Sequence, residues 1–146
     1  KYFANTLPDE HIPQETEILT ETIKWLDMYF FGEEPNFTPP LHPSGSSFRQ
    51  AVWQLLLQIP YGQTITYGEI ARRMAEVKKV PLMSAQAVGG AVGHNEISII
   101  IPCHRVVGTN GSLTGYGGGI DKKISLLNLE HADMSHLFIP KKGTAL

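Results

Sequence analysis

Three scarcities narrow what this chain of 146 residues can be. It has one cysteine, so no internal disulfide can form and no metal site can use two thiolates. No run of apolar residues approaches the roughly 20 that a membrane-spanning helix needs. Charged residues make up 18% of the chain and the net charge is −2, which alone does not indicate a nucleic-acid partner. We expect a globular protein with no membrane partner, and its lone thiol favours a cytoplasmic location.

The charges that are present are unevenly distributed. Residues 1–47 contain two basic and eight acidic groups, whereas residues 48–146 contain ten basic and six acidic groups. This asymmetry places a positive field in the part of the chain that holds the cysteine. It favours an anionic partner for that part, although several of the lysines could equally do no more than solvate a surface.

The single cysteine stands in the tetrapeptide Pro102-Cys103-His104-Arg105. The apolar run before it, residues 97–101, predicts a buried strand that delivers Cys103 to a turn. A thiol attacks as a thiolate, and cationic or proton-accepting neighbours lower its pKa from about 8.5 toward neutrality. The tetrapeptide is therefore consistent with a nucleophilic cysteine held in a turn at the end of the predicted strand. It is equally consistent with a small buried hydrophobic residue, the usual fate of a free cysteine.

Two parts are predicted from the pattern of apolar residues and prolines. Apolar residues recur at helical spacing after Pro13 and predict a helix over about residues 14–31. Four prolines and a Gly-Ser cluster follow between Glu33 and Ser47 and indicate a linker. We expect residues 1–44 to form a helical remnant with a Pro-rich linker, and residues 45–146 to form the main domain.

Three helices are predicted in the first half of the main domain. Ser47, with Gln50 three residues later, has the pattern of a capping box for a helix that ends before residues 60–62. Residues 64–66 form an extended link into a short helix over 68–76. Ser84 can cap a further helix that reaches about residue 92. The last two helices fit a helix-turn-helix, although such a pair is also a common packing unit.

The second half combines a short β-structure with one more helix. Asn110-Gly111, between two apolar segments, is a strong β-hairpin signal. A glycine-dense turn over 115–119 carries Tyr116, and Asp121 is expected to cap a last helix that reaches Glu130. The predicted fold class is α+β, with a mostly helical domain whose short strand and hairpin carry Cys103.

The motifs, in order, resemble those of a known family. Its members are the methylated-DNA–protein-cysteine methyltransferases, or O6-alkylguanine-DNA alkyltransferases, and the resemblance covers about residues 13–131. It rests on Tyr67, the 84–95 segment, Ile-Pro-Cys-His-Arg-Val-Val at 101–107, Asn-Gly-Ser-Leu-Thr-Gly-Tyr at 110–116 and Leu-Glu at 129–130. It implies a one-turnover DNA repair reaction in which Cys103 takes an alkyl group from guanine O6 and keeps it.

The resemblance also implies roles for the residues around Cys103. His104 would be the base, acting through a water, and Glu130 would orient the histidine. Tyr67 and Lys123 would supply protons or positive charge to the leaving guanine. We expect a structural role for Arg105, because its guanidinium can pair with a carboxylate or with carbonyls. No cofactor and no metal are expected.

A duplex base cannot reach a buried thiol, so the resemblance further implies that the nucleotide is flipped out while the second helix of the helix-turn-helix enters the minor groove. The partner would be double-stranded DNA that contains O6-alkylguanine. We expect the protein to be a monomer. Gln86 stands where the family often has an intercalating arginine, and the connector between Tyr67 and Gln86 is about five residues longer than usual. The implied substrate- and DNA-binding residues are Ser84, Ala85, Gln86, Ala87, Gly89, Asn95 as a bridge to the active-site loop, the backbones of Cys103 and Val106, Tyr116 and Gly117.

Three other functions compete with this reading. One is a non-catalytic lesion-binding protein, a class that usually carries tryptophan in place of the cysteine. Another is a helix-turn-helix regulator with a redox-sensing thiol, which would need a basic recognition helix that the uncharged 84–92 segment does not provide. A cysteine hydrolase is the third. Family members usually have a longer N-terminal domain, of which residues 1–44 would be a remnant.

Overall fold

The computed structural model describes residues 13–141 and divides into two compact units, one ending at His42 and the other beginning at Pro43. In the first unit, helix α1 (Pro13–Phe30) confirms the helix predicted over 14–31. Trp25 and Tyr29, one turn apart, are buried and stack with ring centroids 5.3 Å apart. The extended segment that follows contains the prolines of the predicted linker.

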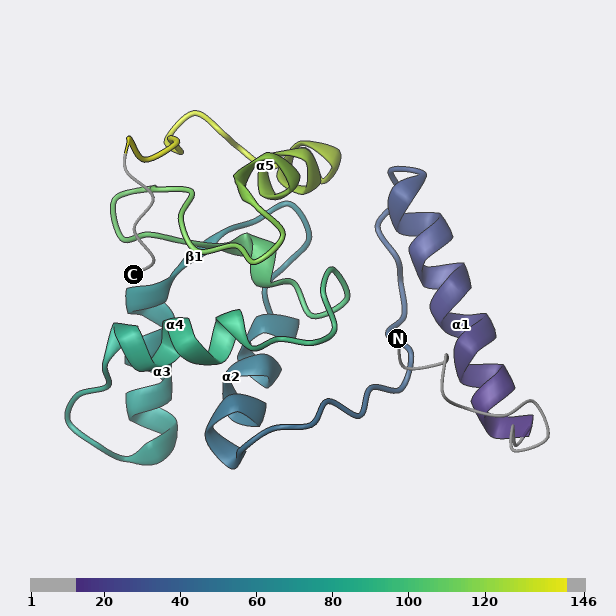
Figure 1. Ribbon diagram of the computed structural model, residues 1–146, viewed down its shortest axis with the longest axis horizontal. Helices are drawn as coiled ribbons and strands as arrows, with labels where there is room; N and C mark the ends of the chain where they lie inside the picture. The colour runs from purple at the N-terminus through teal and green to yellow at the C-terminus, as the bar shows by residue number, and fades with distance from the viewer. Residues whose placement is uncertain (1–12, 142–146) are drawn as a thin grey trace. The chain divides into compact units, whose positions relative to one another are not determined.

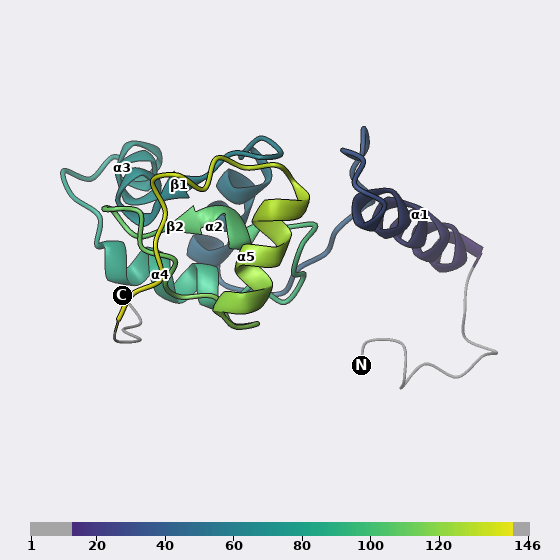
Figure 2. The ribbon, with the colours of Figure 1, turned by 90° about the horizontal axis from the view of Figure 1, so that it is seen from above.

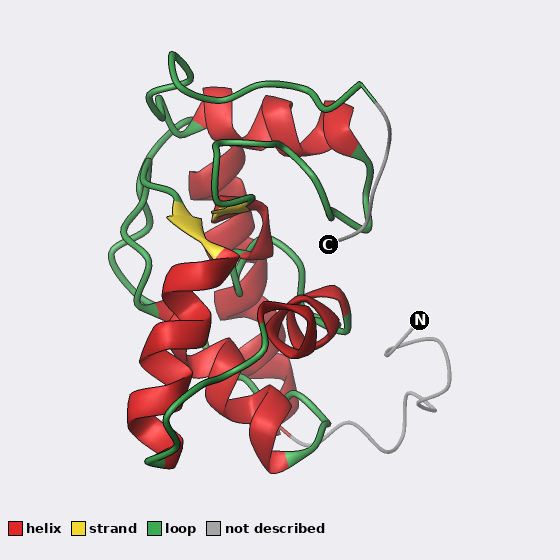
Figure 3. Cartoon of the chain, turned by 90° about the vertical axis from the view of Figure 1, so that its left-hand side faces the viewer, coloured by secondary structure: helices red, strands yellow, loops and turns green. Residues whose placement is uncertain are grey.

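The second unit is mostly helical with a very small sheet (Figure 3). Its two strands pair in parallel, and the sheet lies between α5 and the helices α2, α3 and α4 (Figures 1 and 2). Within the described residues of this unit the elements are α2 (Ser47–Leu57), β1 (Ile65–Thr66), α3 (Tyr67–Lys78), α4 (Ala85–Gly93), the short 3-10 turn η2 (Cys103–Arg105), β2 (Val106–Val107) and α5 (Ile120–Leu129).

A shared apolar core holds α2, α3 and α4 together. Leu56, Ile70, Met74 and Val88 are fully buried. The indole N–H of Trp53 donates a hydrogen bond of 2.9 Å to the Ala91 carbonyl, which joins α2 to α4. The pair α3–α4 thus has the arrangement expected of a helix-turn-helix, mounted on α2.

The predicted helix starts are partly right. Ser84 caps α4 as predicted, since its hydroxyl accepts hydrogen bonds from the first-turn N–H groups. The cap of α2 is Ser46, which accepts from the Arg49 N–H at 3.2 Å, so the capping box predicted at Ser47 is wrong by one residue. The cap of α5 is Gly119, not Asp121. Asp121 lies in the first turn, where a carboxylate still favours the positive end of the helix.

The strand predicted over 97–101 is wrong. The segment forms turns with a single bridge between Ser98 and Ile101, and Ile99 adopts a left-handed φ of 75°. Ile100 and Ile101 are nevertheless buried. An apolar run indicates that a segment is buried, but it does not show that the segment is a strand. Here the buried segment forms turns, and its bridge lies within the segment itself.

The hairpin predicted at Asn110-Gly111 is only half right. The tight turn is present, closed by a hydrogen bond of 2.8 Å from the Gly108 N–H to the Ser112 carbonyl. However, β2 pairs with β1, while the N–H of Leu113 donates to the Phe138 carbonyl at 2.9 Å. The segments on the two sides of the turn therefore have different partners.

In the part of the chain that the structure describes, no helix is long and apolar enough to span a bilayer.

Candidate active site

Cys103 is the first residue of η2 and lies at a cavity of about 330 Å³. The thiol residue is 8% exposed, so it is buried except toward this cavity. The volume falls at the small end of the range of about 300–1,000 Å³ typical of ligand pockets. The walls come from the end of α4, the loop after it and a glycine-rich loop, and the residues are Val92, Gly93, Asn95, Ser98, Gly115, Tyr116, Gly117 and Gly118.

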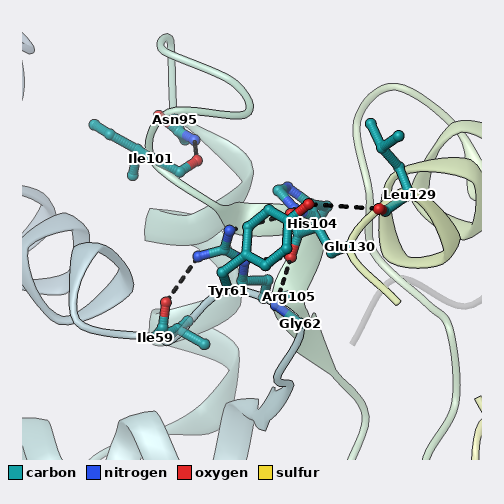
Figure 4. Close-up of polar contacts among 9 residues, drawn as sticks. All are labelled: Ile59, Tyr61, Gly62, Asn95, Ile101, His104, Arg105, Leu129 and Glu130. Carbon is teal, nitrogen blue, oxygen red and sulfur yellow. Dashed lines mark hydrogen bonds and ion pairs between the residues drawn. The ribbon is translucent and has the colours of Figure 1, made fainter. Parts of the chain in front are cut away.

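A buried carboxylate holds the histidine that follows the cysteine. Nε2 of His104 lies 2.6 Å from Oε2 of Glu130, at the end of α5 (Figure 4). Burial alone would raise the pKa of Glu130, but hydrogen bonds from His104 and Arg105 lower it to about 2. Because the carboxylate is ionised, Nε2 is the nitrogen that donates. Nδ1 is then the imidazole nitrogen that can accept a proton.

Arg105 and the turn that follows α2 also bind the Glu130 carboxylate (Figure 4). Nε of Arg105 donates to Oε1 of Glu130 at 2.8 Å and Nη2 donates to Oε2 at 3.1 Å. Nη1 donates to the Ile59 carbonyl at 2.7 Å, and the Gly62 N–H donates to Oε1 of Glu130 at 3.0 Å. The guanidinium also lies over the ring of Tyr61, 5.8 Å from its centroid. The predicted carboxylate and carbonyl partners of Arg105 are thus both present.

The charge state of the thiol differs from the sequence-based expectation. Burial raises the pKa of Cys103, and it outweighs the side chain of Asn95, the charge of Lys123 and two backbone N–H groups, which all lower it. Burial likewise lowers the pKa of His104. The expectation that neighbouring groups bring the thiol pKa toward neutrality is therefore wrong for the resting protein. A neutral thiol beside a neutral imidazole is the favoured state, because neither ion is solvated at this site.

Two proton donors share the Thr114 carbonyl as acceptor and interact electrostatically with the thiol. The Lys123 ammonium is fully buried and donates to the carbonyls of Val106 and Thr114, the latter at 3.0 Å. The Tyr67 hydroxyl donates to the same Thr114 carbonyl at 3.4 Å. Burial lowers the pKa of Lys123 to about 8 and raises that of Tyr67 to about 12. Both groups therefore carry their protons at neutral pH. Their shared acceptor keeps them at the start of the glycine-rich loop.

Glycine is required where this loop passes Tyr67. Gly115 has a φ of +83°, and a Cβ placed on it would lie 2.5 Å from the Tyr67 hydroxyl. A side chain at this position would strain the backbone and displace the tyrosine. In contrast, a Cβ on Gly117 would meet no atom within 4 Å. The open space at Gly117 belongs to the cavity.

The structure brings some predicted site residues to the cavity and not others. Asn95, Tyr116 and Gly117 line it with Cys103. Asn95 also connects the end of α4 to the active-site segment, since its amide donates to the Ile101 carbonyl at 2.9 Å. Val106 does not line the cavity. It is fully buried, its N–H donates to the Cys103 carbonyl and its own carbonyl accepts from Lys123.

Other residues of the site were not predicted. Ser98 and Gly118 line the cavity. The Ile59 carbonyl accepts a hydrogen bond from Arg105, and the Gly62 N–H donates one to Glu130. The sequence carries a signal for Gly118, which belongs to the glycine-dense turn, and for Gly62, which follows a Pro-Tyr pair. Neither signal reveals what these residues contact, and none marks Ser98.

The outer face of α4 consists of small and uncharged side chains. Val88, Ala91 and Val92 are buried against the rest of the unit. Gln86 and Ala87 are exposed in the first turn, next to the exposed cap Ser84, while Ala85 and Gly89 are half-buried. A Cβ on Gly90 would meet no atom within 4 Å. The helix therefore presents a surface from which few side chains project far.

Within residues 13–141, no cluster of three or more His, Cys, Asp or Glu could hold a metal ion.

Comparisons with known proteins identify relatives of this chain. The profile described as "6-O-methylguanine DNA methyltransferase, DNA binding domain" matches residues 47–132. A methylated-DNA–protein-cysteine methyltransferase of Methanosarcina acetivorans is 46% identical over 124 residues, which cover 85% of this chain and 76% of that protein. A protein of the same name from Haemophilus influenzae is 47% identical over 124 residues, which cover 84% of this chain and 66% of that protein.

Solved structures give the same result. The crystal structure of Mycobacterium tuberculosis OGT in complex with DNA matches with a TM-score of 0.68 and 49% identity, covering 77% of this chain and 66% of that one. The chain thus spans 66% to 76% of the length of these three proteins. The profile alone covers more than half of the 146 residues. The chain belongs to the 6-O-methylguanine DNA methyltransferase family.

Proposed function

We propose that this protein repairs DNA by moving an alkyl group from O6 of guanine to Sγ of Cys103, once per molecule. The observation that carries the proposal is the placement of a lone thiol at a ligand-sized cavity, next to a His104 that is held by a buried carboxylate. The names of the relatives and the DNA complex of a structural neighbour support it. On this reading the protein acts in the cytoplasm, on double-stranded DNA at the nucleoid, and without a cofactor.

The chemistry begins with removal of the thiol proton. Nδ1 of His104 takes this proton through a bridging water, and the Glu130 carboxylate stabilises the imidazolium that results. Sγ then attacks the alkyl carbon in line with the bond to O6. The S–C bond forms, the C–O6 bond breaks and its electron pair goes to the guanine. The thioether product is stable, so the cysteine is not regenerated.

The departing guanine needs a proton or a nearby positive charge. The Tyr67 hydroxyl and the Lys123 ammonium are both protonated at neutral pH and both donate to the Thr114 carbonyl. We assign the proton transfer to Tyr67 and the stabilisation of the negative charge to Lys123. Because both groups are buried and preorganised, they need little rearrangement when the charge develops. Arg105 acts only through Glu130, as a structural partner.

The target base reaches the cavity only outside the duplex. Flipping a nucleotide costs on the order of a few kcal/mol, which contacts from α4 in the minor groove would offset. The low outer face of α4 permits close approach, with Ser84, Ala85, Ala87 and Gly89 near the backbone. Gln86 would fill the gap in the stack. Tyr116 and Gly117 would flank the flipped base, and Asn95 would couple α4 to Cys103. The Cys103 N–H donates to the Ile101 carbonyl at 2.8 Å and the Val106 backbone is engaged within the protein, so only the Cys103 carbonyl, which already accepts from the Val106 N–H, could accept a further bond from the guanine edge.

Intact-mass spectrometry tests the proposal directly. After incubation with duplex DNA that contains O6-methylguanine, the protein should gain the mass of one methyl group in place of a hydrogen, and peptide mapping should place it on Cys103. Cys103→Ser should bind the same DNA without gaining mass. Binding without mass gain in the unmodified protein would identify a lesion-binding protein, and repeated turnover would identify a hydrolase. Either result would reject the proposal.

A further inference from the structure

The last turn of α3 and the loop that joins it to α4 carry an exposed surface that the proposed function does not use. Val77 is 59% exposed, Val80 40% and Leu82 84%, although all three are large apolar residues. Lys78 and Lys79 lie between them and are also exposed. We call these five residues the connector surface. The loop projects beyond the N-terminal end of α4 in both views of the second unit (Figures 1 and 2).

The positive charge of the helix-turn-helix is concentrated at this connector surface. The two arginines of α3 are neutralised within their own helix, Arg72 by Glu69 and Glu76 and Arg73 by Glu69, at 2.6–3.2 Å. Lys78 and Lys79 have no ion-pair partner among the described residues, and no acidic residue occurs between Glu76 and Glu96. Since α4 itself is uncharged, these two lysines are its nearest cations along the chain.

The backbone holds these side chains in a defined place. Lys79 ends α3 in a left-handed conformation with a φ of 56°, and the Val80 N–H donates to the Ala75 carbonyl at 3.0 Å. This is the usual geometry of a helix stop, but glycine normally occupies the left-handed position. Pro81 restricts the next bonds and Ser84 caps α4. The loop is therefore pinned at both ends, and its lysines and Leu82 point into solvent instead of packing.

We propose that the connector surface is a second DNA-binding element, which contacts the duplex beyond the N-terminal end of α4. The proposal rests on the proposed function, because it requires α4 to lie on DNA. Lys78 and Lys79 bind phosphates, which match their charge. Leu82 packs against the sugars and base edges of the minor groove, where proteins that bend DNA commonly place apolar side chains. An exposed apolar residue beside two unneutralised cations suits an anionic, grooved partner better than an apolar protein face.

The phosphate contacts are tested by the salt dependence of binding. Affinity for a duplex containing O6-methylguanine is measured by fluorescence anisotropy over a range of salt concentrations, in the Cys103→Ser background so that no transfer occurs. The slope of log affinity against log salt is negative, and each lost phosphate contact makes it shallower by about 0.9. Lys78→Ala with Lys79→Ala should therefore make the slope shallower by about 2 and weaken binding at low salt. The matched control removes two other exposed lysines, Lys122 and Lys141, and should leave the slope nearly unchanged.

The role of Leu82 is tested by comparing two substrates. In the protein with its cysteine intact, Leu82→Ser should slow transfer from duplex DNA several-fold while leaving the reaction with free O6-benzylguanine unchanged. Because the Leu82 side chain is 84% exposed, its replacement should leave folding nearly unchanged. If the unsubstituted protein reacts with neither substrate, the proposed function fails. If it reacts, and the lysine and Leu82 variants match it on DNA, the connector proposal is overturned. A change in oligomeric state on Leu82→Ser, without a change on DNA, would overturn it as well.

Discussion

Replacing Glu130 with Gln keeps the shape of the side chain but removes the charge at the centre of the buried network. The carboxylate accepts hydrogen bonds from His104, Arg105 and the Gly62 N–H. The difference between its ordinary pKa of 4.5 and its pKa of about 2 in the folded protein corresponds to about 3 kcal/mol. Removing one partner of a buried ion pair typically costs about 3–5 kcal/mol, because the other charge is left without compensation. We therefore expect Glu130→Gln to lower the free energy of unfolding by about 3 kcal/mol at pH 7.

The stabilisation by the Glu130 carboxylate depends on pH. A carboxyl group whose pKa is lowered on folding stabilises the protein fully above its ordinary pKa of 4.5, and this stabilisation is lost as the pH falls toward 2. The gap between the unsubstituted protein and Glu130→Gln should be complete at neutral pH and reduced by about half near pH 3. Urea unfolding followed by circular dichroism at several pH values measures it.

Two variants sharpen this test. Glu69 also has a pKa of about 2, owing to hydrogen bonds from Arg72 and Arg73, but it lies on the surface. Solvent screens such pairs, so Glu69→Gln should have a much smaller effect. Combining Glu130→Gln with Arg105→Met should destabilise less than the two single changes together, because no charge is left buried alone. A Glu130→Gln protein as stable as the original at pH 7, or a gap that stays constant down to pH 3, would refute the reasoning.

Three further results are expected. Lys123→Met removes a buried cation near Cys103, so the pKa of the thiol should rise further and transfer should slow, as measured by alkylation rate against pH. Gly115→Ala should destabilise the protein by about 1–3 kcal/mol in urea unfolding and slow single-turnover transfer, because the new methyl group meets the Tyr67 hydroxyl. Gly117→Ala, in open space, is the control for stability and should leave the free energy of unfolding nearly unchanged. Finally, since burial raises the pKa of Cys103, its alkylation by a small electrophile should accelerate steadily from about pH 6 to about pH 9. A plateau beginning below pH 7 would instead indicate a resting thiolate.

Much of the second unit was predictable because its signals are local. Helices α3 and α4 follow from apolar spacing and from a side-chain cap at Ser84, both of which act within one or two turns. The lone cysteine followed by histidine left a nucleophile and a buried hydrophobic residue equally open, and the resemblance to the alkyltransferases favoured the nucleophile. The strand predicted over 97–101 is wrong because a strand needs a pairing partner, and an apolar run does not show whether it has one. The observed pairing joins β1 to β2, two segments about forty residues apart in the chain, and leaves 97–101 out.

The sequence by itself predicted where the helices run, offered Cys103 as the candidate nucleophile and supplied the side chains proposed to assist it, since these properties belong to single residues or short windows. Only the tertiary structure decided how they are arranged. It placed Glu130 on both His104 and Arg105, brought the turn at Gly62 against that carboxylate, and raised the pKa of Cys103 instead of lowering it. The reason is physical: burial and electrostatic environment are sums over distant segments, and no local pattern of residues contains them.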